Sequence, residues 1–207
     1  ALWLGVAGAA LLAIAGPPLM HHAGLDTALA NGATAPLVVF SLSLPLFALS
    51  VTLSFWLEGL GRPGLVTVAM WIANLINLAA NLLLVPGTFG LPALGAVGAA
   101  WSTFVARAAF AAMLAVVIVR LKDARAMGVF DRPAPDLAAA REQRRIGYGA
   151  GGSNLFESGA FAGMSLVAGW LGGLNVAAWA VVLNVAAVIF MVPLGLSTAT
   201  AVQVGRA

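Results

Sequence analysis

The feature that most restricts how this chain can fold is a series of apolar stretches, each about 20 residues long or longer, that carry almost no charge. A helix needs about 20 apolar residues to cross the hydrocarbon core of a bilayer. Lys and Arg number 10 and Asp and Glu number 7 in 207 residues, so only 8% of the chain is charged. A soluble globular domain has about 25% charged residues. The sequence therefore excludes a soluble globular enzyme and predicts a membrane protein.

Six of these stretches are long enough to cross a membrane as a helix. They are 1–20, 34–57, 65–85, 93–120, 149–171 and 176–200. Their apolar and polar residues do not alternate, which argues against strands. We therefore predict an all-α fold, a polytopic transmembrane helix bundle. Because the chain starts inside one apolar run and stops just past another, we interpret it as a piece of a longer protein.

The basic residues predict how the spans are oriented. The connection 121–148 holds six of the 10 Lys and Arg residues. The positive-inside rule places such a connection in the cytoplasm. Six alternating crossings then put Arg62 and Arg206 on the same side, and Arg107 is the one base within a span. We predict a multi-pass protein of the inner (cytoplasmic) cell membrane with 121–148 in the cytoplasm.

Glu157 is the only acid well within a predicted span. A charged side chain at the bilayer centre costs about 2.5–3.5 kcal/mol on insertion scales, so it persists mainly for function or for pairing inside the protein. Asn154 and Ser158 fall on roughly the same side of this helix. A carboxyl group in a water-lined cavity can hold a proton or a sodium ion and exchange it for a cationic ligand. These three residues form the first candidate site.

Other polar residues in the spans have a structural interpretation beside a functional one. They are Asn74, Asn77, Asn81, Thr103 and Asn184. Amides in membrane helices often only hydrogen-bond a neighbouring helix, so packing and ligand binding both stay open for the asparagines. We interpret Arg107 as a residue that locks helices together or pairs with an acid.

The residues that are missing exclude several kinds of function. The chain has no cysteine, and therefore no disulfide, thiolate metal site or cysteine nucleophile. It contains no GxSxG, HExxH or P-loop pattern, and His21 and His22 are adjacent at the edge of a span. A net charge of +3 from dispersed bases forms no nucleic-acid-binding stripe. We expect no enzyme activity, no cofactor, no metal site other than a sodium ion at Glu157, and no nucleic-acid partner.

Four segments resemble stretches of the multidrug and toxic compound extrusion (MATE) transporters. They are FWLEGLGRP at 55–63, INLAANLLL at 76–84, GTFGLPALGAVGAA at 87–100, and FMVPLGLS at 190–197 followed by VQVG at 202–205. Thr103 and Arg107 also stand where the family commonly has a Thr and an Arg. Each segment alone is a weak signal, but all four occur in the family's order and spacing.

The resemblance implies a piece covering about helices three to eight of a twelve-helix protein with two six-helix lobes. Residues 1–120 would be the last four helices of the N-terminal lobe, 121–148 the cytoplasmic link, and 149–207 the first two helices of the C-terminal lobe. Leu155-Phe156-Glu157-Ser158 is similar to a helix-seven stretch of the NorM-type branch, where that Glu lies in the cation site. Gly149 departs from the family, which usually has Pro there. The family's acidic residues on helices one and ten lie outside this chain.

By this resemblance, the expected function is secondary active export of cationic amphipathic drugs in exchange for Na⁺ or H⁺, by a protein that is a monomer when full-length. Glu157 would bind the coupling cation. The cavity residues would be Asn154, Ser158 and Asn184 in one lobe and Asn77, Asn81 and Thr103 in the other. Two alternatives are a lipid-linked oligosaccharide flippase of the same superfamily and a non-transporting membrane remnant or scaffold.

Overall fold

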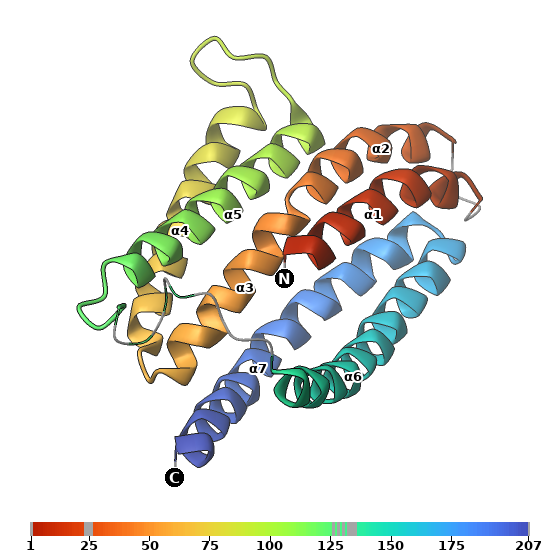
Figure 1. The fold of residues 1–207 in the computed structure, drawn as a ribbon. Helices are drawn as coiled ribbons and strands as arrows, with labels where there is room; N and C mark the ends of the chain where they lie inside the picture. Colours follow the sequence, from red (N-terminus) through yellow and green to blue (C-terminus); the bar gives the residue numbers. More distant parts are fainter. Residues whose placement is uncertain are drawn as a thin grey trace. The chain divides into compact units, whose positions relative to one another are not determined.

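The described residues fold into helices joined by turns and loops (Figure 1). The structure is a computed structural model that describes residues 2–22, 27–125, 127, 129, 131 and 136–206, without the side chains of 27–30, 202 and 206. The helices are α1 (Leu2–His22), α2 (Thr27–Leu42), α3 (Leu44–Gly59), α4 (Pro63–Leu84), α5 (Gly95–Val119), α6 (Leu137–Trp170) and α7 (Gly173–Arg206). The described residues contain no strand, which confirms the all-α prediction.

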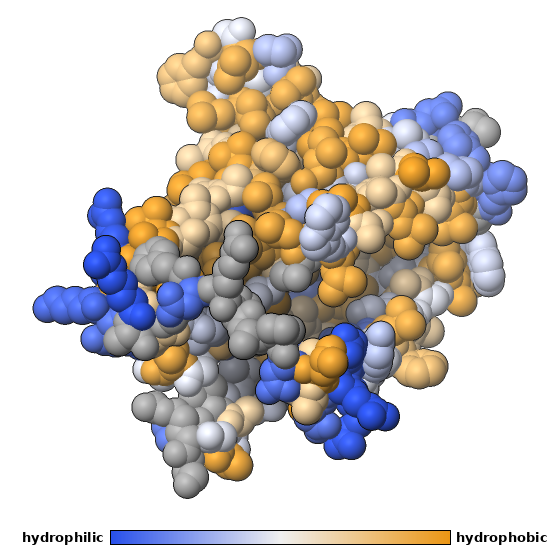
Figure 2. Space-filling view, in the orientation of Figure 1, coloured by the Kyte–Doolittle hydropathy of each residue, from blue (hydrophilic) through white to orange (hydrophobic). Residues whose placement is uncertain are grey.

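Among the described residues, four helices are long and apolar enough to cross a membrane, namely α1, α4, α5 and α7. The bent pair α2 and α3 makes a fifth span if it is counted as one. Apolar residues cover much of the surface seen in Figure 2. Residues 149–170 of the predicted span 149–171 lie in α6, which is long enough but is not among the apolar candidates. Its middle carries Ser153, Asn154, Glu157 and Ser158, and these polar side chains lower its hydropathy. The described helices are thus those of a multi-pass membrane protein.

The predicted span 34–57 is not one straight helix. The chain leaves helical structure at Ser43. The helix axis bends by 42° between the segments Asn31–Leu42 and Leu44–Gly59. Pro45 lies in the first turn of α3, where its missing N–H costs no hydrogen bond. Inside a continuous helix, the proline would remove one backbone hydrogen bond and its ring would clash with the preceding turn. The proline therefore explains why the helix breaks just before it.

The contacts divide the chain into two units, Ala1–Phe130 and Asp131–Ala207, and the division falls inside the predicted connection 121–148. In the first unit, α5 packs against α2, α3 and α4, while α1 packs against α2 and α3. Gly98 lets α4 and α5 come close, since a Cβ there would lie 2.6 Å from the carbonyl oxygen of Leu84. One core cluster joins α3, α4 and α5 and consists of Leu57, Val66, Ala69, Leu114 and Ile118. This packing fixes the polar side chains of α4 and α5.

The Arg62–Asp123 ion pair joins two connections of the first unit. The Arg62 Nη2 lies 3.2 Å from the Asp123 Oδ2, and both side chains are exposed. The turn before α4 and the segment after α5 are therefore at the same end of this unit. The six-span prediction likewise puts both segments on one side of the membrane, and which side that is stays a prediction.

The second unit is a pair of long helices, α6 and α7. The Asp136 side chain caps α6 by accepting hydrogen bonds from the backbone N–H groups of Ala138 and Ala139 at 2.9 and 3.0 Å. The helix then runs without a break through 148–149, so residues 137–148 of the predicted connection form its first turns. Gly172, with φ at +106°, makes the turn into α7, a conformation that a side chain would strain. The Trp179 Nε1–H donates to the Ser165 Oγ at 3.0 Å and ties the two helices together.

Candidate functional site

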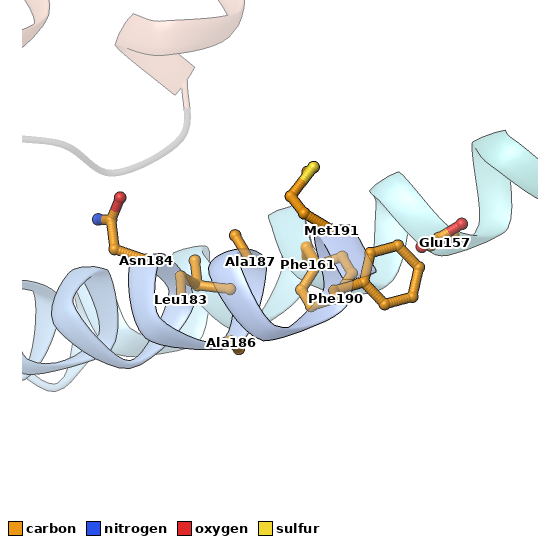
Figure 3. Close-up of a pocket in the computed structure, with 8 residues that line it drawn as sticks. All are labelled: Glu157, Phe161, Leu183, Asn184, Ala186, Ala187, Phe190 and Met191. Atoms are coloured by element: carbon orange, nitrogen blue, oxygen red, sulfur yellow. The ribbon is translucent and has the colours of Figure 1, made fainter. Parts of the chain in front are cut away.

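The candidate site of the second unit is a pocket between α6 and α7 with a volume of about 430 Å³. Figure 3 shows its lining, in which one acid and one amide accompany mainly apolar side chains. The lining residues are Glu157, Phe161, Leu183, Asn184, Ala186, Ala187, Phe190 and Met191. On α7 these residues repeat at three- and four-residue intervals, so they form one stripe of the helix. The pocket therefore combines a negative charge with a long apolar wall.

Glu157 is exposed, and the structure records no hydrogen bond or ion pair for its carboxylate among the described residues. It lies thirteen residues before the end of α6 at Trp170, or about 20 Å along the helix axis. The hydrocarbon core of a bilayer is about 30 Å thick, so a short Glu side chain at this depth cannot reach the interface from that end. A carboxylate in this position can hold a proton, a metal cation or an organic cation.

The structure groups only some of the residues predicted to surround Glu157. Asn184 lines the same pocket from α7 (Figure 3), and its Nδ2 donates to the Ala180 carbonyl oxygen of its own helix at 2.8 Å. Its amide oxygen is therefore left to accept from a ligand. Asn154 and Ser158 are exposed on α6 and do not line the pocket. The Asn154 Nδ2 donates within α6 to the Ala150 carbonyl oxygen at 3.0 Å.

The polar residues predicted in the other lobe meet between α4 and α5. A pocket of about 270 Å³ is lined by Asn74, Asn77, Thr103 and Arg107, together with four apolar side chains. Asn81 does not line it. Its Nδ2 donates to the carbonyl oxygen and to the side-chain Oδ1 of Asn77 at 2.9 and 3.0 Å. The structure thus groups Asn77 with Thr103 and gives Asn81 a supporting role.

Arg107 joins α5 to the break between α2 and α3. Its Nη1–H donates to the Ser43 Oγ at 2.6 Å, and Ser43 in turn donates to the Phe40 carbonyl oxygen at 2.6 Å. The guanidinium also lies over the rings of Phe40 and Phe47, 4.5 and 4.8 Å from their centroids. Arg107 therefore contacts α2, α3 and the residue between them, and its role as a helix lock stays a prediction. Among the described residues it has no ion pair with an acid.

Sequence reasoning missed the partners of Arg107 and the apolar wall beside Glu157. Ser43 precedes Arg107 by 64 residues, so no local pattern links the two. Pro45 follows Ser43 by two residues, and Phe40 and Phe47 lie three residues before and four residues after Ser43, but these residues alone do not predict the break. On α6, Phe161 follows Glu157 by four residues, the spacing that places two side chains on one helix face.

Comparison with known proteins agrees with these observations. The family model described as MatE matches residues 150–207, which include Glu157 and the α7 wall of its pocket. A Caulobacter vibrioides protein named "Probable multidrug resistance protein NorM" is 62% identical over 99% of this chain and 44% of its own length. A Geobacillus kaustophilus protein of the same name is 34% identical over 99% of this chain and 46% of its length. A Photobacterium profundum "Multidrug resistance protein NorM" is 33% identical over 79% of this chain and 36% of its length.

These matches confirm the resemblance inferred from the four segments. The relatives align with almost the whole chain, while the chain spans somewhat less than half the length of the relatives it matches. Both of its units, and therefore both candidate pockets, fall within the part that aligns with the Caulobacter vibrioides relative, apart from two residues at most. Residues 150–207 match the MatE family model, and almost the whole chain is similar to part of proteins named NorM.

Proposed function

We propose that this chain is part of a secondary active efflux transporter that exports cationic amphipathic compounds in exchange for Na⁺ or H⁺. The observation that carries the proposal is the position of Glu157, an acid without a described partner beside an apolar pocket between two helices. The printed names of the relatives, which call them multidrug resistance proteins, support the same function.

Exchange follows because two cations compete for the same negative charge. An ionised carboxylate inside a membrane is costly, so Glu157 binds a proton or Na⁺ when no organic cation is present. An amphipathic cation that places its charge at Glu157 buries its apolar part against Phe161, Phe190 and Met191. Because one carboxylate cannot neutralise both ligands at once, binding of one favours release of the other.

Asn184 supplies an amide oxygen from the opposite helix of the same pocket. Asn154 and Ser158 would join the cavity only if α6 rotated or bent, since neither lines the pocket between α6 and α7. We place the protein in the inner membrane, as a monomer when full-length, with 121–148 in the cytoplasm because that connection carries most of the basic residues. A transporter with this site needs no enzymatic step.

The flippase alternative has less support. A lipid-linked diphosphate calls for several cations in one cavity, whereas Arg107 is the one base within the described apolar spans and the α6–α7 pocket holds an acid. The scaffold alternative does not explain why a carboxylate without a partner among the described residues lies well inside α6.

The test is a Glu157→Gln substitution in the full-length protein. Glutamine keeps the shape and most of the hydrogen-bonding capacity but cannot supply negative charge. We expect normal insertion into the membrane and loss of Na⁺- or H⁺-driven ethidium efflux to the level of cells without the transporter. Glu142→Gln is the matched control, because Glu142 lies in the same helix, is exposed and pairs only with Arg145. Ion-driven efflux retained by Glu157→Gln would contradict the proposal.

A further inference from the structure

The first turns of α6 carry a cluster of bases on one face of the helix. Arg141, Arg144 and Arg145 are three and four residues apart, a spacing that puts side chains on the same face, and all three are exposed. The Arg145 Nη2 lies 3.2 Å from the Glu142 Oε1, an exposed pair that contributes little. Within the described residues Arg141 and Arg144 have no ion pair. This face therefore keeps a net positive charge.

Two aromatic side chains indicate the depth of α6 in a bilayer. Tyr148 directly precedes the predicted span 149–171, Trp170 ends the helix, and both are exposed. They are 22 residues apart, or about 33 Å along the axis. The hydrocarbon core is about 30 Å thick, and Tyr and Trp are enriched at its two interfaces. The spacing therefore fits Tyr148 at one interface and Trp170 at the other.

The basic cluster is then level with the lipid headgroups beside Tyr148. Arg145 and Arg144 precede Tyr148 by three and four residues, or about 4.5–6 Å along the axis. The headgroup layer of each leaflet is about 5–8 Å thick, because the whole bilayer measures about 40–45 Å and its core about 30 Å. Arg141 lies one turn further out, and its long side chain can extend back to the same level. All three guanidinium groups can therefore reach lipid phosphates.

We propose that Arg141, Arg144 and Arg145 form a binding site for the phosphate of an anionic phospholipid in the adjacent leaflet. A guanidinium binds a phosphate through two parallel hydrogen bonds, and three on one face can surround one headgroup. Tyr148 follows Arg141 by seven residues and lies on the same face, where its ring can contact the apolar part of the same lipid. A soluble phosphate gains nothing from Tyr148, which favours the lipid as the source of the anion.

This site goes beyond the proposed function, because it concerns neither the exported compound nor the coupling ion. The positive-inside rule gives the same arginines a simpler role, in which they orient the protein by charge alone and contact no particular lipid. The two roles differ in one measurable property. A headgroup site depends on these three positions, whereas orientation depends on the number of bases in the connection.

Native mass spectrometry of the full-length protein tests the proposal. The protein is released from micelles that contain equal amounts of phosphatidylglycerol and phosphatidylcholine with the same acyl chains, and the ratio of the two retained lipids is measured. We expect the wild type to retain phosphatidylglycerol preferentially. The combined substitution Arg141→Gln, Arg144→Gln and Arg145→Gln should lower the ratio by about fivefold or more, since one base near an anionic lipid contributes about that factor.

The matched control removes three bases at the other end of the same connection. Arg120, Lys122 and Arg125 are also exposed, and replacing all three by Gln changes the net charge by the same amount. Arg120 and Lys122 follow the end of α5 at Val119, so these bases do not form a face of one helix. The control should nearly keep the wild-type ratio. An equal loss in both triple variants would overturn the proposal, because charge alone would then explain retention.

Two further arms cover the remaining outcomes. If the triple α6 variant does not insert, Arg144→Gln replaces it, since Arg144 has no described ion pair to lose, and an unchanged ratio in this variant would overturn the site. Inorganic phosphate is added to the wild type against sodium chloride at the same ionic strength, and neither should displace the lipid more than the other. Selective displacement by phosphate would show a site for soluble phosphate and would refute the lipid as its ligand, as would a wild type without preference for phosphatidylglycerol.

Discussion

The two charged residues that lie deep in the helices, Arg107 in the first unit and Glu157 in the second, are held very differently. Arg107 is half-buried, donates to Ser43 and lies over two aromatic rings. Glu157 is exposed and has no recorded partner among the described residues. Each charge is costly in a bilayer, and the described helix contacts offset part of that cost at Arg107 but not at Glu157. The proposed function gives Glu157 a ligand, the transported or coupling cation.

The two units also differ in how closely their helices pack, and the unit that holds Arg107 is the more closely packed one. The first unit has fully buried side chains in Leu57 and Leu114, and its polar residues are fixed by helices that contact one another closely. In the described part of the second unit, Ala168 is the one buried apolar residue, and one side-chain hydrogen bond joins α6 to α7. A side chain on α6 can therefore reorient at little cost, whereas Arg107 cannot move without disturbing three helices.

The largest expected effect tests this difference in packing. Leu114→Ala removes a fully buried side chain of the first unit, and Leu174→Ala truncates a side chain of the second unit that is 85% exposed. We expect Leu114→Ala to lower the free energy of unfolding by about 2–3 kcal/mol, mainly because a cavity forms. Leu174→Ala should change it by less than about 0.5 kcal/mol. Denaturant unfolding of the full-length protein in mixed micelles measures both, and equal losses would break the comparison.

A smaller effect tests how firmly Arg107 is tied to the helix break. Ser43 and Ser41 are both fully buried and both donate to a carbonyl oxygen of α2, but only Ser43 also accepts from Arg107. Ser43→Ala should therefore destabilise the protein by about 1 kcal/mol more than Ser41→Ala, because a hydrogen bond to a charged donor is lost as well. The same unfolding measurement decides the point. If the two variants lose equal stability, Arg107 does not hold the break.

The helices could be predicted from the sequence, because membrane spans are recognised from local composition alone. The bend at Ser43 could not, although Pro45 was visible, since proline is tolerated within some membrane helices when neighbouring helices satisfy the freed backbone groups. The sequence also predicts a span beginning at 149, whereas the helix begins at Leu137 with Asp136 as its cap, inside the stretch that the charge pattern assigns to a connection.

The candidate sites were predictable to the extent that they follow helix periodicity. Asn77, Thr103 and Arg107 do share a pocket, and Asn184 does lie in the pocket of Glu157. Asn154 and Ser158 lie within four residues of Glu157, but proximity along a helix does not say which side chains the next helix will cover. The contact between Arg107 and Ser43 depends on how α5 packs against two other helices, which no local pattern encodes.

The measurement that tests the central claim most directly is cation binding by Glu157 itself. Purified full-length protein in nanodiscs is titrated with NaCl, with choline chloride as the control for ionic strength, while calorimetry records heat and a pH-sensitive dye records released protons. We predict a saturable signal, heat of Na⁺ binding or proton release, that is absent in Glu157→Gln and unchanged in Glu142→Gln. A Glu157→Gln protein that gives the same saturable signal as the wild type would contradict the account, because the coupling cation would then bind elsewhere.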